Sequence, residues 1–196
     1  MSEARSHSVG VALLAAGSGS RFGGGKLLAA FRGVPLYRLA MDKIPEECAR
    51  VSVVSGTEEI LVEAKTRGFL PILNNRPEDG ISRSIRLALK TLSDCDAVLF
   101  LTADQPLLRR ETVGRILSAS ARHPAHIIVP VRENGEYGNP CLFPAAYFDA
   151  LRALTGDRGG RRVISAHPES VFTVPVADAE LADADTREAL DALARE

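Results

Sequence analysis

The chain contains no tryptophan and only three cysteines, Cys48, Cys95 and Cys141. Because their number is odd and they lack the close spacing of metal ligands, we expect small, buried side chains in a reducing cytoplasm. An excess of charge is also missing, since 24 basic and 25 acidic residues give a formal net charge of -1. This balance indicates no general affinity for nucleic acid or for a membrane surface, so an anion site must be local.

Long hydrophobic runs are missing as well. The start of the sequence, residues 1–7, is polar, and the apolar run after it is too short to span a bilayer. We therefore expect a cytoplasmic protein without a signal peptide. The chain also shows no repeat, low-complexity tract or long linker. With 196 residues and 45% hydrophobic content, it can bury a substantial core as one domain over residues 1–196.

Short β-branched runs alternate with longer helical patterns, which predicts a three-layer α/β fold around a mostly parallel sheet. Most of the predicted strands are apolar throughout, as strands buried on both faces should be. They span residues 11–14, 51–54, 70–73, 97–101, 127–131 and 171–174. Helices are predicted at residues 35–43, 82–92, 110–121, 145–154 and 186–195.

Two further expectations concern the sheet. Residues 131–143 contain Asn134-Gly135 and read as a hairpin, which would make the sheet mixed. In an open sheet of this kind, ligands bind beyond the carboxyl ends of the strands. The loops that follow Leu14, Leu73 and Leu101 are therefore expected to share one crevice.

The most informative segment is an apolar strand that leads into a glycine-rich loop with two basic residues, Arg21 and Lys26. Gly17, Gly19 and the glycine run 23–25 let the backbone turn tightly and bring several N–H groups close to an anion. The two basic side chains supply full charges that match phosphate oxygens. This pattern favours a triphosphate-binding loop over its alternative, a flexible surface loop.

Two better-known phosphate loops fit poorly. A Walker A loop is excluded because Leu27 follows Lys26 where Ser or Thr is required, and Ser20 stands at the position of the earlier glycine. The dinucleotide fingerprint matches only weakly, because its third glycine is out of place. Glu58 and Glu59, which follow the second predicted strand, keep that interpretation open.

Acidic residues stand at two further positions of interest. Asp104 follows the most apolar strand and precedes Pro106, where a carboxylate could hold Mg²⁺ together with substrate phosphates. The alternative is that Asp104 caps the next helix. Asp183 and Asp185 directly precede the last helical pattern, and there an N-cap and a metal ligand are equally good interpretations.

The segment 74–86 combines a glycine, two serines and several arginines at a predicted helix start. Such a helix start can bind an anion or a nucleoside. Ordinary helix capping would also explain Ser82 and Ser84. The segment is therefore a second candidate ligand site.

Together these motifs resemble the nucleotidyltransferases that attach a nucleotide to molybdopterin, the molybdenum cofactor cytidylyltransferases and guanylyltransferases. The resemblance covers nearly the whole chain. Sugar-nucleotide and isoprenoid cytidylyltransferases carry a similar first loop, but they usually have proline directly before the loop lysine, where this chain has Gly25. The matching residues are Leu14-Ala15-Ala16-Gly17, Arg21, Gly23, Lys26 and the segments 80–86, 104–107, 138–140, 156–161 and 183–186.

The resemblance implies a Rossmann-like nucleotidyltransferase fold, with Mg²⁺ as cofactor, that transfers CMP from CTP to molybdopterin and releases pyrophosphate. Ala16 points to the cytidylyl branch, since guanylyl relatives typically carry glycine there and the methyl group leaves less room for a purine. GTP as the nucleotide and another phosphorylated acceptor, such as a sugar phosphate, are the alternatives. A non-catalytic chaperone that delivers the cofactor to a molybdoenzyme is a third.

The resemblance also implies roles for individual residues. Arg21 and Lys26 would neutralise the distal phosphates, and Asp104 and Asp185 would hold Mg²⁺, with Asp183 as the reserve ligand. A client molybdoenzyme or its chaperone is an implied partner. The implied ligand-binding residues are Leu14, Ala15, Ala16, Gly17 and Ser82 on the nucleotide side, and Asn139 with residues 159–161 on the pterin side.

Overall fold

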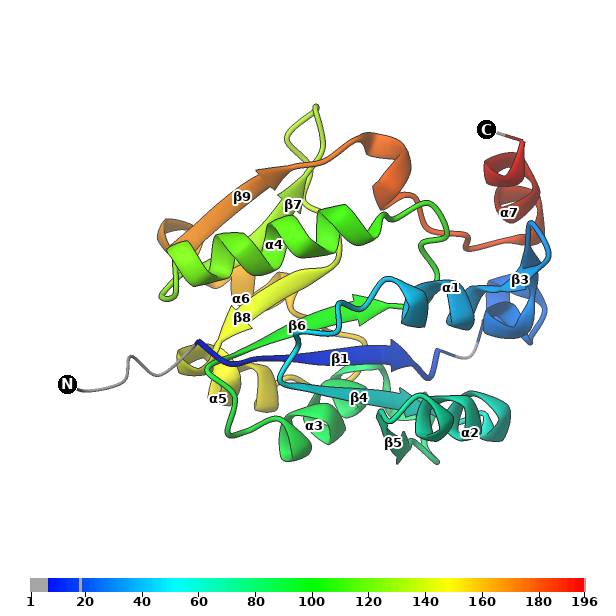
Figure 1. Ribbon diagram of the computed structural model, residues 1–196, viewed down its shortest axis with the longest axis horizontal. Coiled ribbons are helices and arrows are strands. Elements are labelled where there is room, and N and C mark those ends of the chain that lie inside the picture. The colour runs from blue at the N-terminus through cyan, green and yellow to red at the C-terminus, as the bar shows by residue number, and fades with distance from the viewer. Residues whose placement is uncertain (1–6, 18, 196) are drawn as a thin grey trace.

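The computed structural model describes residues 7–17 and 19–195 (Figure 1); residues 1–6, Ser18 of the glycine-rich loop and residue 196 lie outside the described residues. A seven-stranded sheet with strand order β5-β4-β1-β6-β8-β7-β9 forms its centre. All of its strands run in one direction except β8, which is antiparallel to both neighbours. The strands are β1 (Val9–Ala15), β4 (Arg50–Ser55), β5 (Leu70–Leu73), β6 (Ala97–Thr102), β7 (Ile127–Val131), β8 (Cys141–Pro144) and β9 (Val171–Pro175).

Helices cover both faces of the sheet, which confirms the three-layer α/β architecture. Successive side chains of a strand point to opposite faces, so Leu13 of β1 belongs to one apolar cluster and Ala12 to another. The first cluster includes α1 (Leu36–Asp42), α2 (Glu58–Thr66) and α4 (Arg110–Arg122). The second includes α3 (Ile81–Thr91), α5 (Phe148–Arg152) and α6 (Arg161–Ala166).

The five predicted helices all form, because their buried positions recur at helical spacing. In α3, Ile85, Ala88 and Leu89 are buried while Lys90 is exposed. The sequence interpretation missed α2, which buries only Ile60 and Ala64. It also missed the six-residue α6 and the small hairpin of β2 (Ala30–Phe31) and β3 (Val34–Pro35). These elements are too short or too polar for a strong periodic signal.

The predicted hairpin forms only in part. Strands β7 and β8 are antiparallel through Ile128 and Leu142, and Val131 makes an isolated bridge to Tyr137. The longer pairing of β8 is with β6, where its four residues lie opposite 97–100. Strand β8 is therefore inserted between β6 and β7, which makes the sheet mixed as predicted.

A third apolar cluster docks the C-terminal helix α7 (Arg187–Ala194) beside the glycine-rich loop. Leu190 and Leu193 of α7 pack with Phe22 and Phe31. The Oγ1 atom of Thr186 caps α7 by accepting a hydrogen bond from the N–H of Ala189 at 3.1 Å. This packing brings the acidic segment 183–185 next to the loop that carries Lys26.

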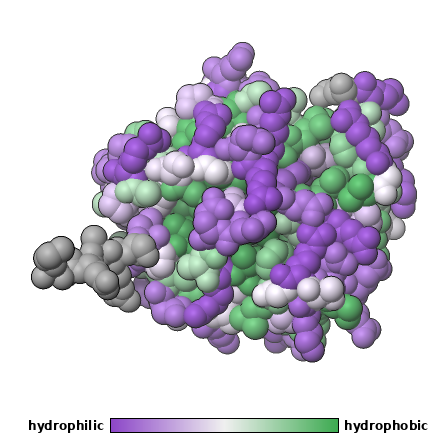
Figure 2. Space-filling view, viewed as in Figure 1, coloured by the Kyte–Doolittle hydropathy of each residue, from purple (hydrophilic) through white to green (hydrophobic). Residues whose placement is uncertain are grey.

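The surface is mixed in character. Seen from the side of α1 and α4, polar side chains cover most of the face, with smaller apolar areas between them (Figure 2). Among residues 7–17 and 19–195, no helix combines the length and apolar character needed to cross a bilayer. Cys95 and Cys141 are buried and Cys48 is half-buried, and all three are free thiols. Burial raises the pKa of Cys48 to about 11 and that of Cys141 to about 12.

Candidate active site

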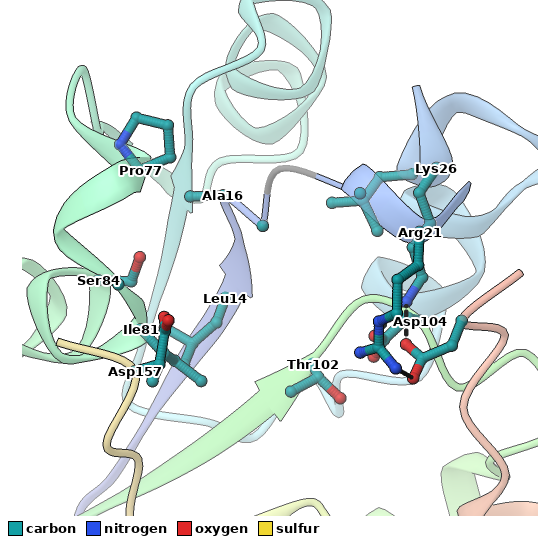
Figure 3. Close-up of a pocket in the computed structure, with 15 residues that line it drawn as sticks. Leu14, Ala16, Arg21, Lys26, Pro77, Ile81, Ser84, Thr102, Asp104 and Asp157 are labelled. Atoms are coloured by element: carbon teal, nitrogen blue, oxygen red, sulfur yellow. Dashed lines mark hydrogen bonds and ion pairs between the residues drawn. The ribbon is translucent and has the colours of Figure 1, made fainter. Parts of the chain in front are cut away.

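The loops that follow β1, β5 and β6 line one cavity of about 300 Å³ at the carboxyl ends of the strands. This confirms the predicted shared crevice. Figure 3 shows Arg21, Lys26 and Asp104 at one end, and Ala16 and Pro77 toward the other. The cavity is lined by Leu14, Ala16, Gly17, Gly19, Arg21, Lys26, Leu27, Pro77, Gly80, Ile81, Ser84, Thr102, Asp104, Asp157 and Asp185.

The charged end of the cavity is built around Lys26. Its Nζ donates to Asp104 Oδ2 at 2.7 Å and to Asp185 Oδ1 at 2.9 Å, and Arg21 Nη1 lies 2.8 Å from Asp185 Oδ2. Burial by itself would lower the pKa of Lys26, but the two carboxylates outweigh it and the pKa is raised. The hydrogen bond from Lys26 is the main reason why the pKa of Asp185 is lowered.

Glycines make the turn that presents Lys26. The carbonyl of Gly19 accepts hydrogen bonds from the N–H groups of Phe22 and Gly24, at 2.9 and 3.1 Å. Gly19 has a φ of 59°, and a Cβ on it would come within 3.0 Å of the Lys26 Cβ. Gly25, with a φ of 64°, precedes the short 3-10 helix η2 (Lys26–Leu28). The loop thus needs left-handed backbone that glycine adopts without strain.

Asp104 and Asp185 do not cap the helices that follow them. The N–H of Arg109, at the start of α4, donates to Glu180 Oε2 at 3.1 Å, whereas Asp104 binds Lys26. At α7 the cap is Thr186, and Asp185 faces Lys26. Helix capping therefore does not explain the positions of Asp104 and Asp185.

The donor set around Lys26 fits a hard divalent cation that shares substrate phosphates. Within residues 7–17 and 19–195, no cluster of three or more His, Cys, Asp or Glu forms a complete protein-only metal site. Asp104 Oδ1 is a buried oxygen without a hydrogen-bond partner in the described structure, and Asp104 and Asp185 both bind one ammonium group. Mg²⁺ commonly takes one or two carboxylates and completes its coordination with phosphates and water.

Asp183 lines a neighbouring cavity, whereas the hydrogen bonds of Lys26 are with Asp104 and Asp185. Desolvation at that position, and the nearby carboxylates of Asp104 and Asp185, raise its pKa to about 6, while a hydrogen bond with Gln105 opposes the shift. Asp185, rather than Asp183, makes the contact with Lys26.

The start of α3 forms the other end of the first cavity. A Cβ on Gly80, which has a φ of 81°, would lie 2.3 Å from the Gly156 backbone, so only glycine permits this approach. The N–H of Ser82 donates to the Gly156 carbonyl at 3.2 Å, but its side chain is fully buried and does not line the cavity. Ser84, two residues further along α3, lines it instead.

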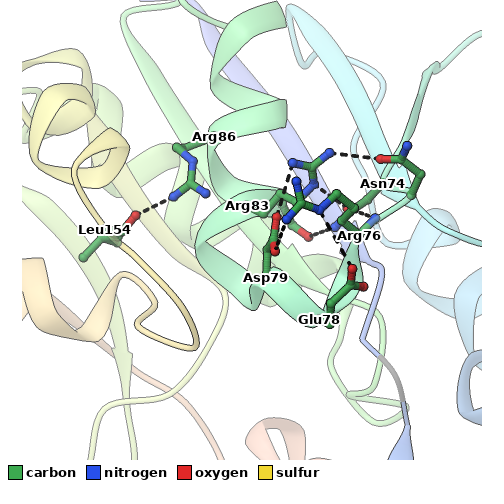
Figure 4. A network of polar contacts seen from close by, with 9 residues as sticks. Asn74, Arg76, Glu78, Asp79, Arg83, Arg86 and Leu154 are labelled. Carbon is green, nitrogen blue, oxygen red and sulfur yellow. Dashed lines mark hydrogen bonds and ion pairs between the residues drawn. The ribbon is translucent and has the colours of Figure 1, made fainter.

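The arginines of the 74–86 segment form hydrogen bonds with neighbouring groups of the protein (Figure 4). They do not line the first cavity. Arg83 Nε donates to Asn74 Oδ1 at 2.9 Å, and Arg76 Nη2 donates to Asp79 Oδ1 at 3.1 Å. Arg86 binds the carbonyl of Leu154. Of this candidate second ligand site, Gly80 and Ser84 line the first cavity, whereas the three arginines bind other groups of the protein.

A second cavity, of about 390 Å³, adjoins the first and shares Leu14, Ile81 and Thr102 with it. It gathers Asn139 and residues 159–161, the segments expected on the acceptor side. Gly160 is required there, because a Cβ would come within 2.6 Å of the Phe143 ring.

Ala15, which was expected near the nucleotide, is 2% exposed and belongs to the apolar core. Its carbonyl accepts a hydrogen bond from Ser55 Oγ at 2.8 Å. Sequence reasoning gave no role to Thr102, which lines both cavities, or to Gln105, which lies in the matching segment 104–107 and lines the second cavity. Their position within two residues of Asp104 was the available signal.

The family description "MobA-like NTP transferase domain" matches residues 11–171, and the chain belongs to this family of nucleotidyltransferases. The fold is similar to that of Rv0371c from Mycobacterium tuberculosis H37Rv in complex with manganese, with a TM-score of 0.78 and 22% identity over 97% of this chain and 99% of that one.

Two other solved structures share the fold. CMP:2-keto-3-deoxy-manno-octonic acid synthetase complexed with CTP has a TM-score of 0.75 and 13% identity, over 96% of this chain and 97% of that one. A nucleotidyl transferase from Methanothermobacter has a TM-score of 0.78 and 19% identity, over 96% of both chains. At such identities the likeness establishes the fold alone.

Proposed function

We propose that this chain transfers CMP from CTP to molybdopterin, which forms the cytosine dinucleotide of the cofactor and pyrophosphate. The observation that carries the proposal is a pair of adjoining cavities. One is lined at its charged end by Arg21, Lys26, Asp104 and Asp185. The other is lined by the loops expected on the acceptor side. Family membership supports transfer from a nucleoside triphosphate. The choice of CTP rests on Ala16 and on the resemblance of the sequence motifs.

In the proposed complex, the triphosphate lies along the charged end of the first cavity. Lys26 exchanges its carboxylate partners for phosphate oxygens, and the exposed Arg21 adds a second positive charge. An oxygen of the acceptor phosphate forms a bond to the α-phosphorus, and the bond from that phosphorus to the bridging β-oxygen breaks. Pyrophosphate carries away the released charge, which Lys26 and Arg21 partly neutralise.

Asp104 and Asp185 are the proposed Mg²⁺ ligands, with Asp183 in reserve. A bound Mg²⁺ would supply positive charge between the phosphates of the two substrates. The buried Asp104 Oδ1 without a partner in the described structure supports this assignment. The CTP complex of the octonic acid synthetase and the manganese complex of Rv0371c are consistent with nucleotide and divalent metal binding in this fold.

The acceptor is proposed to occupy the second cavity, with its pterin toward Asn139 and residues 159–161. Its terminal phosphate would reach the first cavity beside Thr102, which lines both. Holding both reactants at this junction supplies the in-line geometry, so that positioning accounts for much of the rate.

The test is pyrophosphate release with CTP or GTP, each with molybdopterin, a sugar phosphate or no acceptor. We expect Mg²⁺-dependent turnover with CTP and molybdopterin. Turnover with GTP but not with CTP would place the chain in the guanylyl branch. Turnover only with another phosphorylated acceptor would show that molybdopterin is not the acceptor. Tight nucleotide and cofactor binding without pyrophosphate release would favour a chaperone that delivers cofactor to a molybdoenzyme.

A further inference from the structure

A buried lysine outside both cavities holds the loop that carries Asp104. Lys43 stands at the C-terminal end of α1 and is only 8% exposed. Its Nζ donates to the backbone carbonyls of Gln105 at 2.7 Å and of Pro106 at 3.0 Å. These are the carbonyls of the two residues that directly follow Asp104, so one ammonium group fixes the path of the chain beyond the candidate metal ligand.

A buried carboxylate holds the other end of the same loop. Glu180, in the 3-10 helix η6 (Asp178–Leu181), is 6% exposed. Its Oε2 accepts from the N–H of Arg109 at 3.1 Å and from Oγ1 of Thr112 at 2.7 Å. The loop between Asp104 and α4 is thus held by a buried cation at one end and a buried anion at the other. The charge of Glu180 favours the protonated form of Lys43.

The same contacts join the two candidate metal ligands. The N–H of Ala184 donates to the backbone carbonyl of Asp104 at 2.9 Å. Ala184 directly precedes Asp185, and Glu180 lies a few residues earlier on the same segment. A shift of the loop relative to this segment would therefore change the separation of the Asp104 and Asp185 carboxylates, both of which bind Lys26.

We propose that Lys43 and Glu180 are positioning residues for the nucleotidyl transfer reaction, because they fix the Asp104 carboxylate relative to that of Asp185. The proposal rests on the proposed function. Neither side chain lines either of the two cavities, so they act through the loop and not on the substrates. Removing one of them leaves buried backbone groups or a buried charge without a partner, and the loop relaxes to satisfy them.

The test uses Lys43→Met, which keeps the length of the side chain but removes the donors, and Glu180→Gln, which keeps the shape but removes the charge. Lys43→Arg is the conservative variant, and Lys90→Met, at an exposed position of α3, is the matched control. The activity measurements are kcat, the KM for CTP and the Mg²⁺ concentration that gives half-maximal rate. A second measurement is the rate at which an amine-reactive reagent labels Lys26 in the folded protein, with exposed Lys65 as the internal reference.

For Lys43→Met we expect roughly a tenfold or greater loss of kcat and a similar rise in the Mg²⁺ requirement, as for groups that orient metal ligands. The KM for CTP should change much less. Labelling of Lys26 should become severalfold faster relative to Lys65, because its carboxylate partners are displaced. Glu180→Gln should show the same pattern more weakly, and Lys43→Arg should restore part of the activity.

A purely structural role would lower the melting temperature and leave the Mg²⁺ requirement and relative Lys26 labelling at their wild-type values. That result in either folded variant overturns the proposal. Should Lys43→Met fail to fold, Glu180→Gln decides the question by the same measurements. Wild-type protein that releases no pyrophosphate with any nucleotide would refute the proposed function separately. In that case unchanged Lys26 labelling would still overturn the positioning role, and faster labelling would support it.

Discussion

Lys26 and Arg21 both contact Asp185, but they do so in different surroundings. The Lys26 side chain is 11% exposed and that of Arg21 is 75% exposed. Exposed ion pairs contribute about 0 to 1 kcal/mol, since water screens them and the side chains lose freedom. The shielded Lys26 pair is therefore the contact that holds Asp185 in place. Arg21 is left comparatively free to meet an incoming anion.

Asp104→Asn is the sharpest test of the charge at this site. The change keeps the side-chain shape but removes the negative charge opposite Lys26, so we expect at least about a hundredfold loss of turnover. Circular dichroism should show an unchanged fold. Asp149→Asn, at an exposed position of α5, is the control. Magnesium-dependent activity close to that of the wild type would rule out Asp104 as a metal ligand.

The proposed preference for CTP over GTP tests the role of Ala16, which lines the first cavity. A poor fit of about 1 to 3 kcal/mol corresponds to roughly ten- to two-hundredfold discrimination. Ala16→Gly should reduce the preference without reversing it, because contacts to the base must come from other residues as well. Competition between the two nucleotides measures the effect, with the exposed Ala125→Gly as control. An unchanged preference would mean that Ala16 does not border the base.

The pH dependence of folding stability reports on Lys43. Burial lowers its pKa from 10.5 to about 8, against the opposing charges of Asp42 and Glu180. Between these two pKa values the unfolded chain binds more protons than the folded one, so this contribution to the free energy of unfolding rises with pH. The full change is about 3 kcal/mol, at roughly 1.4 kcal/mol for each pKa unit.

Urea unfolding of the wild type and Lys43→Met measures this contribution, because other titrating groups cancel in the difference. We expect the wild type to gain stability relative to the variant between about pH 8 and about pH 10.5. A difference that does not change over this range would contradict the shifted pKa.

At the scale of elements, α7 is the part that completes the site. Its buried face packs on Phe22, which belongs to the glycine-rich loop, and the Arg187 guanidinium lies 4.9 Å from the centre of the Phe22 ring. The segment that carries Asp185 lies between this docked helix and the contact of Ala184 with Asp104. The position of the Asp185 carboxylate therefore depends on packing at a distance from the cavity.

Leu190→Ala tests this dependence. Truncating a buried leucine costs about 2 to 5 kcal/mol, and in a short helix at the edge of the fold the loss should appear as local undocking of α7. We expect a raised Mg²⁺ requirement and faster hydrogen exchange in α7. Asp191→Ala, on the exposed side of the same helix, should change neither. A destabilised variant with the wild-type Mg²⁺ requirement would show that α7 does not place Asp185.

At the scale of the whole molecule, one continuous sheet divides the two large apolar clusters, and β1 and β6 contribute to both. A strand whose two faces are both buried couples the helical layers. If either layer separated, it would expose the apolar face of the sheet that it covers. The chain should therefore unfold as one unit, in keeping with the single domain expected from its length and composition.

Equilibrium urea unfolding followed by two probes tests this expectation. Far-UV circular dichroism reports on all helices and strands. Tyrosine fluorescence, undisturbed by tryptophan, reports on the three tyrosines. Tyr37 is buried in the first cluster and Tyr147 packs against the second, while Tyr137 is exposed. We expect the two transitions to coincide. Two separate transitions would show that the layers on the two faces of the sheet unfold independently.

The sequence by itself determined the framework of this protein. Apolar runs and helical spacing located the strands 70–73 and 127–131 and the long helices α3 and α4, because periodicity is a local property. The order of strands and loops also predicted that the segments after β1, β5 and β6 meet in one cavity. Elements such as α2, with only two buried positions, carried too weak a pattern to be found.

Only the tertiary structure decided which side chains meet. Asp185 binds Lys26 in a segment directly before α7, which docks on Phe22, and Ser84 lines the cavity in place of Ser82 because of the rotation of α3. No local sequence pattern indicated a role for Lys43 or Glu180. Their partners include backbone groups 62 and 71 residues away in the sequence. Contacts over such separations are set by the packing of the layers and not by a pattern of neighbouring residues.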